Sequence, residues 1–129
     1  MLIRHGFIQC LLGLTLVLLT TASFAGYSNK WRIEVSERAR NDGILLFRFT
    51  PKGEDDFRIE VPIAEGISEN SVAHQIRSTF RKHLSRDKFT VEVDDGEDVL
   101  VKRKRGSPVF DLDILEDTVK GTRINLDKE

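Results

Sequence analysis

The chain has 129 residues, enough for one hydrophobic core and too few for two full domains. Its 20 Lys and Arg residues nearly balance its 21 Asp and Glu residues, giving a formal net charge of −1. That balance does not favour a nucleic-acid binder or a membrane-surface protein.

The first 25 residues have the pattern of a cleavable export signal. Arg4 supplies the basic start, residues 7–19 are uncharged and mostly large and apolar, and a small-residue cleavage motif occupies 23–25. The apolar stretch is shorter than the about 20 residues of a spanning helix, which disfavours the alternative of an uncleaved anchor. We therefore expect residues 26–129 to form one small periplasmic or secreted domain, with no stable membrane insertion. Since Cys10 is the only cysteine, that domain could form no disulfide.

Alternating apolar and polar residues predict three strands after the signal. Stretch 31–35 is the first, and a turn signal at 41–43 separates it from 44–50. Residues 44–50 are the most apolar, so this strand should lie centrally in its sheet. A polar connection at 51–56 leads to the third strand, 57–63. Because both connections are too short for a crossover helix, we expect an antiparallel meander.

A single amphipathic helix is predicted from Ser68 to near Asp87. The Ser68 hydroxyl can accept a hydrogen bond from the free amides of the first turn, and Ile67 and Val72 have the spacing of a hydrophobic staple across that cap. At 100° per residue the apolar side chains fall within one arc of about 120°. They are Val72, Ala73, Ile76, Phe80 and Leu84.

Three or four further strands follow the helix. Residues 88–93 and 99–101 flank the acidic turn 94–98, in which Gly96 can take the positive φ that a hairpin often requires. Stretch 110–114 comes next, and a short last strand at 122–126 should lie at an edge. The order βββ-α-βββ(β) predicts an α+β domain, in which one helix packs on one face of an antiparallel sheet of six or seven strands.

Two basic segments are the candidate anion-binding or partner-binding surface. One follows the polar side of the helix, and the other extends the strand that begins at residue 99. Their members are Arg77, Arg81, Lys82, Arg86, Lys102, Arg103, Lys104 and Arg105. Such clusters can bind a phosphate, a carboxylated glycan or an acidic protein surface. The alternatives are a solvated helix face and a charged strand end that discourages aggregation.

His83 lies on the apolar arc of the predicted helix. It is either a boundary residue at the rim of the sheet or a ligand-binding group in a pocket under the helix. His74 points to the opposite side, so the two cannot share a metal ion. The acidic turn 94–98 lacks the spacing of a calcium loop, since Lys102 stands at the glutamate position. No known catalytic motif occurs, and we expect no metal, cofactor or catalytic residue.

Three hypotheses about function follow. The first is a non-enzymatic envelope protein that binds a macromolecule, either by strand addition at the last strand or by docking an acidic surface on the basic segments. Its partner would be a protein or another envelope component, not a nucleic acid. The second is a small-ligand or anion-binding module with a pocket near His83. The third is a hydrolase whose site matches no known motif.

Overall fold

Residues 26–129 form seven strands and one helix in the computed structural model, and the predicted export signal lies outside these described residues. The order of elements matches the predicted α+β arrangement, with mainly antiparallel strands and a helix after the third. The elements are β1 (Lys30–Ser36), β2 (Gly43–Pro51), β3 (Phe57–Ile63), α1 (Glu69–His83), β4 (Phe89–Asp94), β5 (Asp98–Arg103), β6 (Phe110–Asp117) and β7 (Arg123–Lys128).

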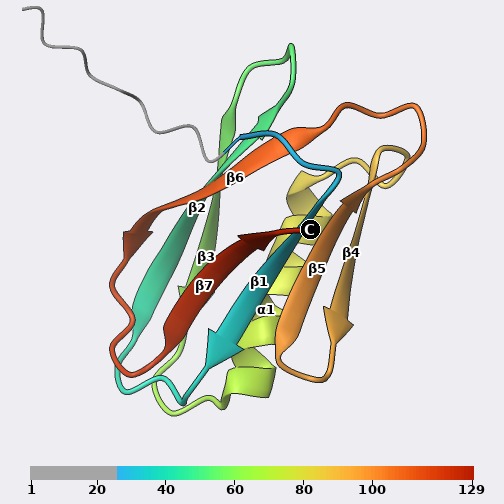
Figure 1. Ribbon diagram of the computed structural model, residues 1–129. Helices are drawn as coiled ribbons and strands as arrows, with labels where there is room; N and C mark the ends of the chain where they lie inside the picture. Colours follow the sequence, from blue (N-terminus) through green and yellow to red (C-terminus); the bar gives the residue numbers. More distant parts are fainter. Residues whose placement is uncertain (1–25) are drawn as a thin grey trace, which may run out of the picture.

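The strands divide between two antiparallel sheets instead of the single sheet that we predicted. One sheet has the order β4-β5-β1-β7 and the other the order β3-β2-β6 (Figure 1). The predictions that β2 is central and that β7 is at an edge are confirmed. The predicted meander is wrong at its first connection, because β1 pairs with β5 and β7, whereas β2 pairs with β3 and β6.

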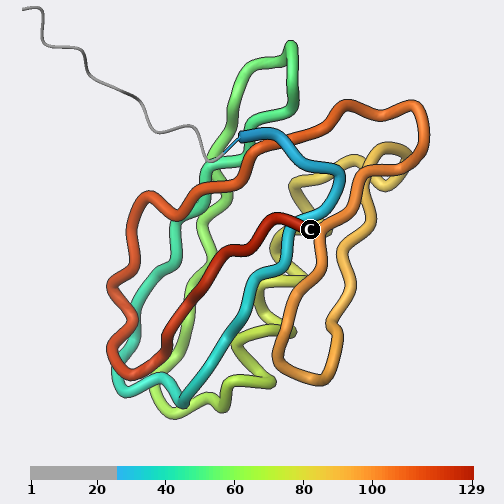
Figure 2. The backbone as a smooth tube through the Cα atoms, in the orientation of Figure 1, coloured from blue at the N-terminus to red at the C-terminus, as the bar shows by residue number. Residues whose placement is uncertain are grey.

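The connection 37–42 explains this difference, because it crosses between sheets and does not close a hairpin (Figure 2). Its backbone amides bond to distant segments: Ala39 N donates to Ile67 O at 3.1 Å and Arg40 N donates to Lys120 O at 2.8 Å. Ala39 is also buried. Contacts with distant segments therefore fix the connection 37–42. Although it is short enough for a hairpin, β1 and β2 do not pair with each other.

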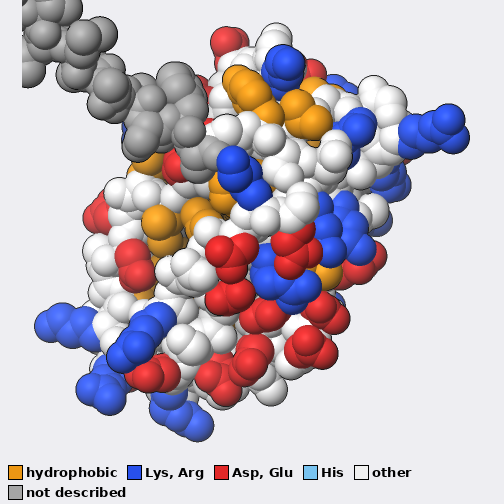
Figure 3. Space-filling view, in the orientation of Figure 1, with side chains coloured by type: hydrophobic (Ala, Val, Ile, Leu, Met, Phe, Trp, Pro, Cys, Tyr) orange, Lys and Arg blue, Asp and Glu red, His pale blue; other side chains and the backbone are white. Residues whose placement is uncertain are grey.

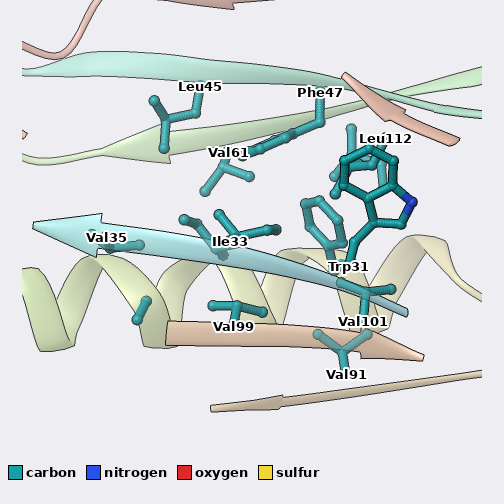
Figure 4. Close-up of a cluster of buried hydrophobic side chains, with 14 of the residues drawn as sticks. Trp31, Ile33, Val35, Leu45, Phe47, Val61, Val91, Val99, Val101 and Leu112 are labelled. Atoms are coloured by element: carbon teal, nitrogen blue, oxygen red, sulfur yellow. The ribbon is translucent and has the colours of Figure 1, made fainter. Parts of the chain in front are cut away.

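The inner faces of the two sheets bury their apolar residues against each other. Figure 4 shows Ile33 on β1 facing Phe47 on β2 and Val61 on β3 across the core. Phe49 lies at the centre of an aromatic cluster, with its ring centroid 4.7 Å from that of Phe110 and other rings close by. Each sheet thus supplies the apolar surface that the other must bury.

Helix α1 packs against β4, β5 and β1 of the four-stranded sheet and also against β3, the edge strand of the other sheet, so it covers part of one face of the first sheet and closes the side of the sandwich next to β3 (Figure 1). The predicted cap is confirmed, because Ser71 N donates to the Ser68 hydroxyl at 3.3 Å. Phe80 packs edge-on against Phe47, with 5.1 Å between ring centroids. The helix ends at His83, before the predicted Asp87, because Leu84 turns into the core with an extended backbone.

Candidate binding cleft

A cleft at the outer edge of β4 brings together residues from both predicted basic segments. Its volume is about 380 Å³, and it lies where the end of α1, the start of β4 and the turn after β5 meet. The residues that line it are Arg81, Arg86, Phe89, Thr90, Val91, Glu92 and Lys104. We call this site the basic cleft.

The short connection after α1 places two of the cations. Lys88 N and Phe89 N both donate to Ser85 O, at 3.1 and 3.0 Å, which turns the chain sharply from the helix into β4. Lys104 N then donates to Lys88 O at 2.7 Å, so that the end of β5 stays beside the beginning of β4. Arg86 and Lys104, which are far apart in the sequence, therefore meet at the same corner of the sheet.

Arg81 is fixed on the remaining side by a bond to the strand edge. Since Lys88 O faces β5, the alternation of an antiparallel ladder turns the backbone of Val91 away from β5, toward α1. Val91 O accepts a hydrogen bond of 2.9 Å from Arg81 Nε. The terminal nitrogens of Arg81 donate no hydrogen bond to residues 26–129, so they are available to an anion.

The charge of the basic cleft is mainly positive and unpaired. Arg86 and Lys104 make no ion pair within the described part of the chain. Glu92, the one carboxylate of the lining, is already 3.7 Å from Lys102 Nζ. The walls include the buried apolar side chain of Phe89. A concave, partly apolar site concentrates the field of its cations, and these can bind a carboxylate or phosphate by charge-assisted hydrogen bonds.

Five of the eight predicted basic residues do not line the cleft, namely Arg77, Lys82, Lys102, Arg103 and Arg105. Arg103 binds within the fold: its guanidinium donates to Ser107 O at 2.9 Å and contacts the Asn29 side chain. Arg77 Nε is buried without a hydrogen-bond partner in residues 26–129. Lys82 and Arg105 are exposed and extend the positive charge next to Arg81 and Lys104 along the chain.

His83 lies on the exposed surface of the last helical turn. Its Nδ1 is 2.9 Å from Thr79 O, so one ring nitrogen has a backbone partner within the same helix. None of the three best-defined cavities in residues 26–129 is lined by His83, and the space under the helix is filled by core side chains such as Phe80. His74 is exposed too.

The far end of the β4–β5 hairpin is acidic. Asp94, Asp95, Glu97 and Asp98 surround Gly96, and we call residues 94–98 the acidic turn. Asp95 and Gly96 take positive φ values of 51° and 77°, a backbone that Gly and Asp tolerate better than most residues. Figure 3 shows acidic side chains gathered in the lower middle of the view, with basic ones to their upper right and another basic group at the lower left.

Arg32 on β1 neutralises half of the acidic turn, an interaction that sequence analysis missed. One of its terminal nitrogens lies 3.2 Å from Asp94 Oδ2 and 2.9 Å from Asp98 Oδ2. Hydrogen bonds with Glu129 and then with Asp98 raise the pKa of Arg32 above its already high ordinary value. The sequence did show that charged residues alternate along 30–36 and should face outward. It did not show which carboxylates Arg32 would contact.

The rest of the turn keeps its negative charge. Asp95 and Glu97 make no ion pair within residues 26–129. The nearby charge of Glu69 raises the pKa of Glu97, with burial as the next cause, so negative charge is in local excess here. In the part of the chain that the structure describes, no three His, Cys, Asp or Glu side chains are arranged to hold a metal ion.

Comparisons with protein-family models, with curated proteins and with solved structures gave no match. Among residues 26–129, the helix is too short and too polar to cross a bilayer. The geometry of the basic cleft is therefore the main guide to function.

Proposed function

We propose that this domain is a non-enzymatic binding module, and that its basic cleft receives acidic groups of a macromolecular partner. The observation that carries the proposal is the convergence of Arg81, Arg86 and Lys104 around a single carboxylate, which already has a cation of its own. Three cations held close together without partners cost electrostatic energy, and an incoming anion relieves that cost.

A macromolecular partner fits the surroundings of the cleft. Lys82 and Arg105 are exposed and directly follow Arg81 and Lys104 in the chain, so further positive charge lies next to two of the cleft residues. A small anion would fill the cavity but would not reach these outer cations, whereas an extended acidic surface would contact both. The cavity of about 380 Å³ also supports a second candidate function, the binding of a small anion alone.

We further propose that the domain works outside the cytoplasm, on the strength of the export pattern in residues 1–25. Mass spectrometry of the chain recovered from the periplasm or the culture medium tests this directly. A new amino terminus at Gly26 is expected. A chain that begins at Met1 and stays with the membrane would contradict the proposal.

Binding of labelled poly-L-glutamate, followed by fluorescence anisotropy, tests the function. The cleft-reversed variant carries Arg86→Glu and Lys104→Glu. Its matched control carries Arg58→Glu and Lys120→Glu, the same charge change at exposed positions outside the cleft. We expect affinity to fall by about tenfold or more in the cleft-reversed variant and by much less in the control.

Three results decide between the candidates. Equal losses in both variants would mean that only net charge matters, and absence of binding by the wild type would remove the proposed function. If inorganic phosphate at low concentration displaces poly-L-glutamate completely, the small-anion candidate is favoured. Circular dichroism of each variant shows whether the fold is intact.

A further inference from the structure

We infer that the acidic partner of the basic cleft is the acidic turn of a second copy of this chain, in a two-fold symmetric dimer. This inference rests on the proposed function, because it requires the cleft to receive carboxylates. It adds the identity of the partner and the geometry of docking.

The β4–β5 hairpin carries opposite charge at its two ends. The basic cleft lies along the first four residues of β4, and the acidic turn begins at its last residue, Asp94. β4 has six residues, and at about 3.4 Å per step its first and last residues are roughly 17 Å apart. One edge of the domain therefore presents a positive and a negative site at a fixed separation.

Two-fold symmetry makes this edge complementary to itself. When the β4 strands of two copies lie side by side and run in opposite directions, the acidic turn of each copy comes beside the basic cleft of the other. Both contacts then form at once, as in an isologous interface. A parallel arrangement would instead place like charges together, so the charges select the antiparallel one.

The groups that this dimer needs are available on both sides. Asp95 is exposed at the tip of the turn, and neither Asp95 nor Glu97 has an ion pair in residues 26–129. Arg86 and Lys104 are likewise unpaired among the described residues. The raised pKa of Glu97 reflects negative charge crowded beside it, which a cation from the second copy would relieve.

Docking takes place through side chains and not through strand addition at β4. Arg81 of α1 already occupies Val91 O, a backbone acceptor on the outer edge of β4 that a backbone ladder with a second strand would need. Asn70 lies on the same side of α1 as Arg81. Its side-chain amide is close to Gly96, because a Cβ added to Gly96 would be 3.6 Å from it. A contact made by exposed charges without a continuous backbone ladder should be weak and strongly dependent on salt.

Analytical ultracentrifugation of the exported chain tests the dimer by charge exchange. The cleft-reversed variant is Arg86→Glu with Lys104→Glu. The turn-reversed variant is Asp95→Asn with Glu97→Lys, where Asn tolerates the positive φ at position 95. The wild type should dimerise at about 20 mM salt and dissociate at about 500 mM.

Each variant alone should be monomeric at about 20 mM salt, because its two sites have lost their opposite charges. An equimolar mixture of the two variants should restore a one-to-one dimer, since each altered site then meets its complement. Unfolded or damaged variants could not produce that restoration.

Other outcomes overturn the inference. A mixture that stays monomeric, or variants that each dimerise like the wild type, would show that these charges do not form the interface. A wild type that is monomeric at low salt but binds poly-L-glutamate through the cleft would refute the dimer and leave the proposed function standing. Failure of both measurements would remove the two together.

Discussion

Replacing Phe49 by alanine should be among the most damaging changes to the core. The Phe49 side chain is fully buried, and its ring lies 4.7 Å from Phe110, 5.0 Å from Phe89 and 5.2 Å from Phe57, measured between centroids. It therefore joins β2, β3 and β6 of one sheet to β4 of the other. Truncating such a side chain removes its transfer energy and leaves a cavity, at a cost of about 3–5 kcal/mol.

Phe57→Ala is the matched control, because it deletes the same atoms at the neighbouring position on β3. Phe57 is only partly buried and has one close aromatic neighbour, so about half the loss is expected. Urea unfolding monitored by the fluorescence of Trp31, the only tryptophan, gives both values. Equal losses, or a loss below about 1.5 kcal/mol for Phe49→Ala, would refute the idea that this ring links the sheets.

Three further predictions concern local features. Hydrogen bonding to Arg32 lowers the pKa of Glu129 to about 2 from its ordinary 4.5. The ionised carboxylate therefore stabilises the fold above pH 4.5, and this contribution is lost as the pH falls toward 2. The difference in unfolding free energy between the wild type and Glu129→Gln should vanish over that interval. Ser68→Ala removes the helix cap and should lower the unfolding free energy by about 1 kcal/mol, measured by urea titration. Gly121→Ala should lower the melting temperature more than Gly53→Ala, because both have positive φ but only at Gly121 would a Cβ lie 2.6 Å from a backbone oxygen.

Features that depend on neighbouring residues were predictable from the sequence. The Ser68 cap and the hairpin around Gly96 follow from side-chain chemistry within a few positions, and both are confirmed. Strand pairing was not predictable in the same way. The alternation in 31–35 shows that one face of β1 is buried but does not say which strand lies beside it. Its partners begin at residues 98 and 123, and pairing at that distance depends on the whole core.

The candidate site was predictable in its residue types but not in its assembly. Arg81, Arg86 and Lys104 stand out as cations, yet so do the five basic residues that lie elsewhere. Convergence depends on the sharp turn at Ser85 and on the bond between Lys104 N and Lys88 O. Both are properties of the folded backbone.

The pairing of β1 has a consequence for the order in which the domain forms. β1 is the first strand of the described chain, but its two neighbours are β5 and β7, and Glu129 N bonds back to Lys30 O at 2.9 Å. A chain emerging amino end first would expose the apolar face of β1 until nearly the whole domain had followed it. Folding stepwise during emergence is therefore blocked, and the domain should acquire its structure late and in a single cooperative event.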